Sequence, residues 1–268
     1  MSTNQRPDRP HPRHSLIAID VDGTLIAHGE AVSTANKRAI VSARRAGIRM
    51  VLATGKSWPG VQDIAGEIGP DGPHIVVNGT RIVGVEDADV FLEPDVCERA
   101  LQAGRSAGIP WCVYMEHDDL YVSVEAVQAL VGADEPRSAM RTDPPAGRAL
   151  KVLFCIEEGR TDREQLIERA MAGSECKLVR TSPFFYEVMP PDADKGSALA
   201  RLLEHLGMDP SECLAMGDAE NDLPMFAQAG CAVAMATAPA DVKAAADAVV
   251  PAAMGADGVA WAIEHFAL

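Results

Sequence analysis

Basic residues are scarce in this sequence. It carries 24 lysines and arginines against 39 aspartates and glutamates, which gives a formal net charge of −15. Because phosphate backbones attract surfaces rich in lysine and arginine, this charge argues against a nucleic-acid partner. A small phosphorylated metabolite remains compatible with it, since a metal ion and one local lysine can capture such a ligand.

Paired cysteines, long apolar runs and a secretion signal are also missing. The six cysteines lie far apart, with no Cys-x-x-Cys pair and no zinc-ligand spacing, so we expect reduced residues in a cytoplasmic protein. No apolar run reaches the length that spans a membrane, and we expect no membrane partner. Residues 1–13 lack the apolar segment of a signal peptide, and their Arg, Pro and His content predicts a disordered tail.

The first motif is an apolar run that ends in two acids. Residues 16–19 read Leu-Ile-Ala-Ile and continue into Asp20-Val-Asp22-Gly-Thr. Such a short run favours a buried strand, and ligands of open α/β sheets bind just beyond the carboxyl ends of the strands. Two carboxylates there repel each other unless a cation lies between them, which favours a hard divalent metal. The alternative is an ordinary strand-ending turn, since Asp and Gly are common in turns.

A helix and a second strand follow. The helix is predicted between Ser33, which can cap its start, and Gly47, which can close it, and the strand over 48–54. This βαβ unit predicts a parallel sheet. Thr54 and Gly55 end the second strand, and a hydroxyl with free backbone N–H groups near a helix start makes a phosphate cradle. For so short a motif, an ordinary loop entry is the alternative.

A third apolar run, residues 74–77, ends in Asn78 and Gly79. Asn78 lies at the corresponding strand end and could contact a substrate, although Asn-Gly is first of all a turn signal. His74 opens this strand, and we expect a structural role for it.

The pattern changes between residues 83 and 188. Short strands with alternating apolar residues are separated there by Asp, Gly and Pro turns and interrupted by helical segments. This pattern predicts an α+β insert with a partly antiparallel sheet. We therefore expect a catalytic core built from residues 14–82 and 189–268, with an inserted cap at 83–188.

The α/β pattern resumes at Lys195. This lysine opens a helix that runs to Leu206, so its ammonium would point toward the ends of the strands. A solvated lysine in that first turn is the alternative, but it is unfavourable against the helix dipole. A further buried run ends at Asp218, and Asp222 follows on the same face of the next turn. Four acids facing one crevice would repel one another, and a metal removes the difficulty.

These motifs, in this order, resemble those of the haloacid dehalogenase-like (HAD) phosphatases. The resemblance rests on Asp20-x-Asp22-Gly-Thr, Thr54-Gly55, Lys195-Gly196 and Gly217-Asp218-x-x-Asn221-Asp222. The insert between the second and third motifs looks like the larger α/β cap of the Cof-type subgroup. The resemblance implies an α/β fold, with a Rossmann-like parallel-sheet core and an inserted α+β cap that determines substrate specificity.

The resemblance also implies the chemistry. It implies a phosphomonoesterase that uses Mg²⁺ to hydrolyse a small phosphorylated metabolite, a sugar phosphate or a nucleotide- or cofactor-type phosphate, through an aspartyl-phosphate. Asp20 would be the nucleophile and Asp22 the general acid and base. Mg²⁺ would be bound by Asp20, the backbone carbonyl of Asp22 and the carboxylate of Asp218, with Asp222 orienting metal-bound water. The phosphoryl oxygens would be held by Thr54, Gly55, Asn221 and Lys195, the last also acting in catalysis.

Two positions depart from the family pattern. Lys56 stands where arginine is common, and lysine lacks the bidentate fork of arginine, so the substrate contact at this position should differ. Asn78-Gly79-Thr80 replaces a version that more often ends in alanine.

Two other functions remain open. A phosphosugar mutase on the same scaffold would keep the four motifs, but its captive bisphosphorylated intermediate calls for more cap cations than Arg148 and Lys151. A non-enzymatic sensor of phosphorylated metabolites is less favoured, because all four motifs are intact. The sequence does not indicate the physiological substrate or the oligomeric state.

Overall fold

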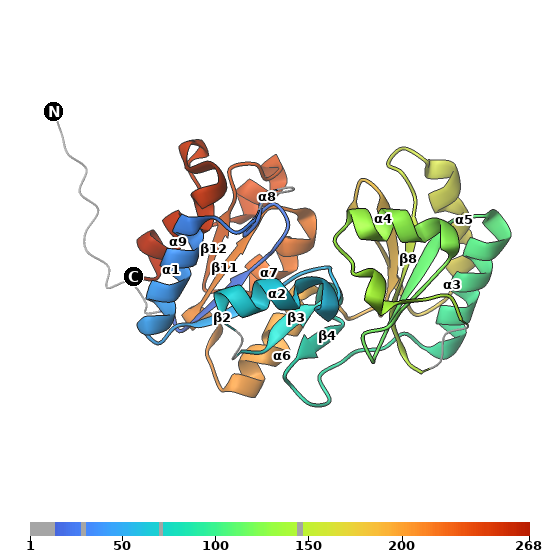
Figure 1. Ribbon diagram of the computed structural model, residues 1–268, viewed down its shortest axis with the longest axis horizontal. Helices are drawn as coiled ribbons and strands as arrows, with labels where there is room; N and C mark the ends of the chain where they lie inside the picture. Colours follow the sequence, from blue (N-terminus) through green and yellow to red (C-terminus); the bar gives the residue numbers. More distant parts are fainter. Residues whose placement is uncertain (1–13, 28–30, 70–71, 144–146) are drawn as a thin grey trace.

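Two sheets of different construction lie next to each other along the long axis of the molecule (Figure 1). This computed structural model describes residues 14–27, 31–69, 72–143 and 147–268. The tail predicted for residues 1–13 therefore lies outside the described part of the chain. Within the described ranges no helix is long and apolar enough to cross a membrane.

The first sheet is parallel and has five strands in the order β13-β12-β11-β1-β2. The strands are β1 (Leu16–Ile19), β2 (Arg49–Leu52), β11 (Cys213–Gly217), β12 (Cys231–Ala234) and β13 (Ala248–Val249). A two-stranded antiparallel hairpin, β3 (His74–Val76) with β4 (Arg81–Val83), continues this sheet through a single parallel bridge between Ala53 and Ile75. The strands that carry the predicted site residues are thus close neighbours.

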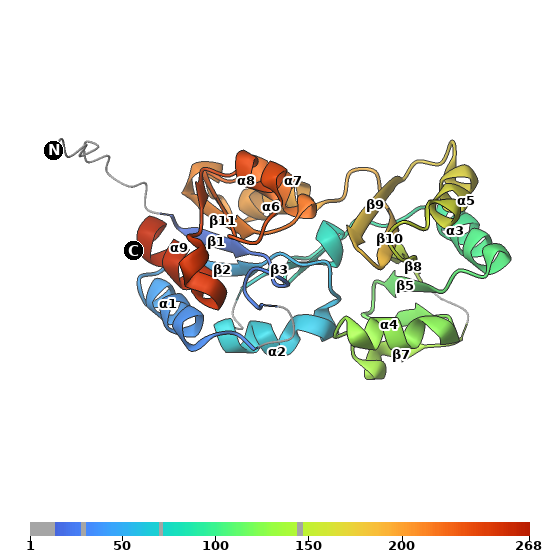
Figure 2. The same cartoon turned by 90° about the horizontal axis from the view of Figure 1, so that it is seen from above.

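Helices cover both faces of the parallel sheet, because successive residues of β1 point to opposite sides. Ile17 and Ile19 belong to the apolar cluster that includes α1 (Thr34–Arg45), α2 (Trp58–Ile68) and α9 (Gly258–Phe266). Leu16 and Ala18 belong to the cluster with α6 (Lys195–Leu206), α7 (Leu223–Gln228) and α8 (Ala240–Ala245). Figure 2 shows the two helix layers on either side of the sheet.

The second sheet has six strands in the order β7-β6-β5-β8-β10-β9. All of its pairs are antiparallel except β6 with β7. The strands are β5 (Trp111–Met115), β6 (Leu120–Val122), β7 (Met140–Arg141), β8 (Ala149–Cys155), β9 (Lys177–Ser182) and β10 (Phe185–Met189). One face packs against α3 (Pro94–Ala107) and α5 (Thr161–Met171), and α4 (Val127–Gly132) packs on the other.

The predicted parallel-sheet core with an inserted α+β segment is confirmed. The helix expected from Lys195 is α6, whose start is capped by the Asp194 side chain accepting from the Ser197 backbone N–H (2.8 Å). The helix expected after Ser33 is α1, and Ser33 Oγ accepts from the Asn36 N–H (3.1 Å). The second strand is shorter than predicted, because β2 pairs with β1 over four residues only.

Candidate active site

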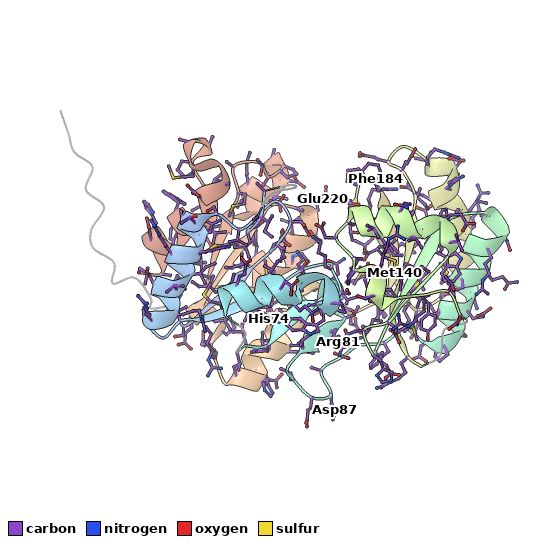
Figure 3. All side chains as sticks on the ribbon, in the orientation of Figure 1. His74, Arg81, Asp87, Met140, Phe184 and Glu220 are labelled. Atoms are coloured by element: carbon purple, nitrogen blue, oxygen red, sulfur yellow. The ribbon has the colours of Figure 1, made fainter. Side chains whose placement is uncertain are left out.

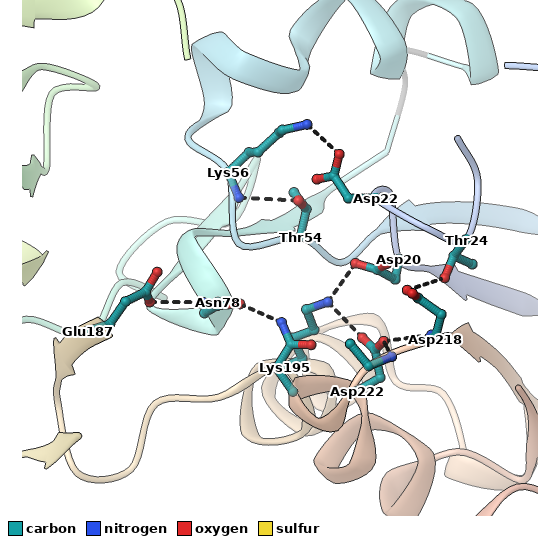
Figure 4. Close-up of polar contacts among 12 residues, drawn as sticks. Asp20, Asp22, Thr24, Thr54, Lys56, Asn78, Glu187, Lys195, Asp218 and Asp222 are labelled. Atoms are coloured by element: carbon teal, nitrogen blue, oxygen red, sulfur yellow. Dashed lines mark hydrogen bonds and ion pairs between the residues drawn. The ribbon is translucent and has the colours of Figure 1, made fainter. Parts of the chain in front are cut away.

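Three acids from neighbouring strand ends meet at the carboxyl edge of the parallel sheet. Asp20 follows β1, and Asp218 and Asp222 follow the adjacent β11. One carboxylate oxygen from each of the three lies within 4.8 Å of the others. Asp20 and Asp222 are buried, so water compensates little of the repulsion between these carboxylates. Asp20, Asp218 and Asp222 therefore lie close together, as the sequence predicted (Figure 4).

Lys195 lies among these acids. Its Nζ is 2.6 Å from Asp20 Oδ1 and 2.7 Å from Asp222 Oδ1, and its side chain is 1% exposed. Burial alone would lower the pKa of Lys195, but the two carboxylates outweigh burial and raise that pKa. Burial raises the pKa of Asp20 well above its usual range, against the attraction of Lys195 and with repulsion from Asp222 and Asp218. One ammonium therefore leaves the three acids short of positive charge.

The donor set fits a hard divalent cation. All three side chains offer carboxylate oxygens, the ligands that Mg²⁺ prefers. The pKa of Asp218 is raised by burial and by the nearby Asp222, and a cation among these oxygens would offset the repulsion between the two carboxylates. The structure therefore supports a site for a metal ion at Asp20, Asp218 and Asp222.

The surroundings of Asp218 and Asp222 fix both side chains. Thr24 Oγ1 donates to Asp218 Oδ1 (3.1 Å), and Asp222 Oδ2 accepts from the backbone N–H groups of Asp218 (2.9 Å) and Ala219 (3.0 Å). A Cβ at Gly23 would lie 2.2 Å from Asp218 Oδ2, so only glycine fits there. Thr24 belongs to the first motif, and the sequence alone assigned it no role.

Asp22 lies apart from the acid cluster. Its side chain is 46% exposed, and its Oδ1 accepts from Lys56 Nζ at 2.6 Å. The same ammonium lies 3.2 Å from Asp134 Oδ2, which follows α4 in the second sheet's half. Burial would lower the pKa of Lys56, but Asp22 and Asp134 raise it overall. The carboxylate of Asp22 is thus free of the metal cluster, and only its backbone carbonyl remains a candidate ligand.

The loop after β2 follows the second strand as predicted, and its polar groups contact one another and Glu135. Thr54 is buried, and its Oγ1 accepts from the Lys56 backbone N–H (3.2 Å). At the start of α2, the Ser57 N–H (2.9 Å) and hydroxyl both donate to the buried carboxylate of Glu135. Glu135 therefore occupies the two donors of Ser57, whereas the donors that the sequence assigned to a phosphate cradle belong to Thr54 and Gly55.

Asn78 occupies a strained turn and is held on both sides. Val77, Asn78 and Gly79 have φ values of 53°, 54° and 87°, a left-handed run that is costly for valine. Asn78 Nδ2 donates to Glu187 Oε2 (2.9 Å), and its Oδ1 accepts from Asn221 Nδ2 (3.1 Å). The side chain expected to touch substrate therefore reaches the site through Asn221.

The two cap cations considered for a mutase are both paired. Lys151 is buried and donates to Glu187 Oε1 (2.7 Å) and to the Gly55 carbonyl (3.0 Å). Arg148 Nε lies 2.8 Å from Glu116 Oε2. Neither is free to hold a second phosphoryl group.

The second sheet also contacts the part of the protein that carries the parallel sheet at a point away from the acids. Arg81 lies on β4 (Figure 3). It reaches the turn between β5 and β6, where its Nη1 lies 3.1 Å from Asp118 Oδ1 and donates to the Glu116 carbonyl. This contact ties the hairpin of the first half to the second sheet. This turn between β5 and β6 is therefore occupied by a contact with the hairpin.

A cavity of about 610 Å³ lies in the second half. Its wall includes Ala133 at the end of α4, Cys155 on β8, Phe185 on β10 and Arg163. Phe185 and Cys155 are paired across β10 and β8, and two residues further along β10 is Glu187, which contacts Asn78. Asp134, next to Ala133, contacts Lys56. The cavity thus shares its walls with the elements that touch the acid-bearing half.

Comparisons with known proteins match most of the chain, including the residues of both sheets. A sequence model described as haloacid dehalogenase-like hydrolase matches residues 17–263. The chain is 31% identical over 253 residues to the 5-amino-6-(5-phospho-D-ribitylamino)uracil phosphatase YcsE of Bacillus subtilis, covering 94% of this chain and 96% of that protein. It is 30% identical over 275 residues to the chloroplastic endoribonuclease YBEY of Arabidopsis thaliana, covering 96% of this chain but 47% of the relative. The chain thus spans about half the length of that relative.

A solved structure gives the same result for the fold. A haloacid dehalogenase-like hydrolase from Bacteroides thetaiotaomicron superposes with a TM-score of 0.81 at 27% identity. The superposition covers 94% of this chain and 99% of that one. It therefore includes the second sheet as well as the parallel one.

Proposed function

The chain belongs to the haloacid dehalogenase-like hydrolases, and from this we propose that it is a phosphatase that hydrolyses a small phosphorylated metabolite with the help of Mg²⁺. The observation that carries the proposal is the buried Asp20, held 2.6 Å from Lys195 beside Asp218 and Asp222. A carboxylate fixed by an ammonium at a strand end is placed to attack a phosphoryl group. The curated relative from Bacillus subtilis that matches over nearly its full length bears the name of a phosphatase.

We assign the two chemical steps to Asp20 and Asp22. In the first, an Asp20 oxygen forms a bond to phosphorus, the bond from phosphorus to the leaving oxygen breaks, and that oxygen takes a proton from Asp22. In the second, Asp22 takes a proton from water, the water oxygen bonds to phosphorus, and the bond between phosphorus and Asp20 breaks. The exposed position of the Asp22 carboxylate supports this role, since it can reach both the leaving group and solvent.

Charge on the phosphoryl oxygens would be stabilised by Lys195, Asn221 and the loop at Thr54 and Gly55. Mg²⁺ would be held by Asp20, Asp218 and the Asp22 backbone carbonyl, with Asp222 in support. When bound there, it would reduce the repulsion between the Asp20 carboxylate and an anionic substrate. Lys195 alone does not balance three acids, and this supports the metal. Asp222 would act mainly by holding the loop, since both of its oxygens already have protein partners.

We propose that residues 83–188 form the cap and that the cavity bounded by α4 and β10 receives the non-phosphate part of the substrate. Its wall combines apolar surface with Glu157, with Arg160, which pairs with Asp162, and with Arg163, whose side chain has no hydrogen bond or ion pair to another described residue. Such a lining suits a leaving group with an apolar or planar part and an anionic group, compatible with a nucleotide- or cofactor-type phosphate as well as a sugar phosphate. Specificity of this kind comes from contacts that distinguish competing substrates.

The pairing of Lys151 and Arg148 disfavours a phosphosugar mutase. A mutase must hold a bisphosphorylated intermediate while it turns, and that needs unpaired cations facing the site. A cytoplasmic location is our further proposal, supported by six cysteines that are all free thiols.

The test is hydrolysis of a panel of phosphorylated metabolites by the purified protein, with Mg²⁺ and with a chelator. The proposal expects release of inorganic phosphate that depends on Mg²⁺ and a preference within the panel. Binding without turnover would favour the sensor, and transfer of phosphate between positions of one sugar would favour the mutase. Arg163→Gln should raise KM for anionic leaving groups while leaving a small neutral ester unaffected, which tests the cavity assignment separately.

A further inference from the structure

Glu187, on β10 of the second sheet, is a buried carboxylate with donors on both oxygens. It is 2% exposed. Its Oε1 accepts from Lys151 Nζ (2.7 Å) and Thr181 Oγ1 (3.0 Å), and its Oε2 accepts from Asn78 Nδ2 (2.9 Å). A carboxylate paired with an ammonium only accepts hydrogen bonds. Asn78 must therefore turn its NH₂ group toward Glu187.

The orientation of Asn78 sets that of Asn221. With its NH₂ directed at Glu187, Asn78 presents Oδ1 on its other side, and this oxygen lies 3.1 Å from Asn221 Nδ2. An amide oxygen requires a donor opposite it, so Asn221 must place its NH₂ group there. One hydrogen of that NH₂ is used by Asn78, and the second remains for another acceptor. Figure 4 shows the line of contacts from Glu187 through Asn78.

The backbone around Asn78 is built to hold this chain of amides. Its N–H donates to the Thr54 carbonyl (2.9 Å), and the Val77 N–H donates to the Lys56 carbonyl (2.9 Å). These bonds keep the left-handed turn in place against its steric cost. A Cβ at Gly55 would lie 3.0 Å from Asn78 Oδ1, so the glycine leaves room for the amide. A turn with this cost is explained by the placement of one side chain.

We propose that Glu187 is a positioning residue for phosphate binding: through Asn78 it fixes the amide of Asn221 with the NH₂ group directed to the phosphoryl site. This inference rests on the proposed phosphatase function. It adds that a residue of the cap segment, two side chains away, sets the polarity of a phosphate donor in the core. Removing the negative charge of Glu187 while keeping its shape should reverse each amide in turn.

The test compares Glu187→Gln with a variant in which the two groups are exchanged. In Glu187→Gln, the glutamine NH₂ can face Asn78, so Asn78 and then Asn221 turn over, and an oxygen replaces the NH₂ of Asn221 near the phosphate. A hydrogen bond to a charged group is lost, so the Ki of inorganic phosphate should rise about tenfold or more. In Glu187→Gln with Asn78→Asp, the carboxylate moves to position 78, again only accepts, and returns the NH₂ of Asn221 to its native orientation.

Thr181→Val is the matched control, because it removes a donor to the same carboxylate without reversing any amide. The Ki of inorganic phosphate as a competitive inhibitor, the direct binding of phosphate by calorimetry and the thermal unfolding of each variant are measured. We expect weak phosphate binding in Glu187→Gln, recovery in the exchange variant, and a value near wild type in Thr181→Val.

The outcomes distinguish the proposed relay, in which Glu187 orients Asn78 and Asn78 orients Asn221, from its alternatives. Unchanged phosphate binding in a folded Glu187→Gln variant overturns the relay, and so does an exchange variant that binds as weakly as the single variant or fails to fold. If Glu187→Gln itself does not fold, the exchange variant decides alone, and native-like phosphate binding supports the relay. A wild-type protein that neither binds phosphate nor hydrolyses a phosphate ester contradicts the proposed function instead.

Discussion

Lys195 Nζ lies between the carboxylates of Asp20 and Asp222, at 2.6 Å and 2.7 Å, with all three side chains buried. The ammonium opens α6, where the helix dipole disfavours a cation. Its position is therefore explained by the acids and not by the helix. The same arrangement makes the acid cluster depend on Lys195 whenever no metal ion is bound.

Lys195→Met should destabilise the protein strongly in the presence of a chelator. Removing one partner of a buried ion pair typically costs about 3–5 kcal/mol, because the remaining charges stay buried. Mg²⁺ should restore part of this loss by neutralising the same carboxylates. Urea unfolding with and without Mg²⁺ measures both effects.

Lys177→Met provides the control for that experiment. Lys177 pairs with Asp194 at 3.0 Å, but its side chain is 26% exposed, so its loss should cost about 1 kcal/mol or less. Equal losses in the two variants would contradict the account of the buried cluster.

Asp218→Asn should remove most of the response to Mg²⁺. In the wild type we expect Mg²⁺ to raise the melting temperature, because binding to the native state alone stabilises it. The variant lacks one anionic oxygen donor but keeps nearly the same shape. Calorimetric titration with Mg²⁺ gives the affinity directly, and an unchanged affinity would place the metal elsewhere.

Lys56→Met should slow turnover most for substrates with poor leaving groups. Lys56 holds Asp22 at 2.6 Å, and a misplaced general acid loses up to about 10²–10⁴-fold in rate where the leaving oxygen needs a proton. An aryl ester with a good leaving group needs little protonation, so its kcat should fall much less. A parallel loss for alkyl and aryl esters would refute the positioning role.

Asp134→Asn is the companion variant, since it loosens Lys56 from the cap side but leaves the contact with Asp22. We expect a smaller loss with the same dependence on the leaving group. Because the Asp134 side chain is 78% exposed, its contribution to stability should be slight.

His74 should make stability depend on pH. Burial lowers its pKa from 6.5 to about 4, and its Nδ1 accepts from the Leu52 backbone N–H (3.1 Å). The unfolded chain therefore binds a proton at a higher pH than the native protein. Stability from this residue is complete above pH 6.5, falls as the pH drops from 6.5 to about 4, and changes no further below that.

The loss over that window should be about 3 kcal/mol. His74→Asn keeps an acceptor for the Leu52 N–H but does not titrate in this range, so the variant should lose less stability than the wild type between pH 7 and pH 4. Parallel stability curves for the two proteins would show that His74 is not the group responsible.

The sequence predicted those parts of the site that follow directly from local pattern. Asp20, Thr54 and Asp218 each end an apolar run, and parallel strands bring their carboxyl ends to one edge, so their meeting could be inferred. The contacts made by Asp134, Glu135 and Glu187 could not be inferred in the same way. They come from the segment that carries the second sheet, and which of its acids meet the parallel-sheet core depends on how the two sheets pack together.

The orientation of the Asn78 amide likewise could not be predicted from the sequence. Its position after a strand follows from the sequence, but the left-handed turn at Val77 and the carboxylate of Glu187 decide which way its amide points. Neither feature has a local sequence signal. Likewise, the backbone N–H and the hydroxyl of Ser57 at the start of α2 donate to Glu135, 78 residues away in the chain.

Phosphorylation of Asp20 during turnover can be detected by rapid quenching. Enzyme mixed with excess substrate is quenched in acid at successive times within the first turnover, digested, and analysed by mass spectrometry, with Asp20→Asn treated in parallel. We expect a transient phosphoryl group on the peptide that contains Asp20 in the wild type and none in the folded but inactive variant. Turnover without any phosphopeptide, or with the phosphoryl group on another residue, would contradict it.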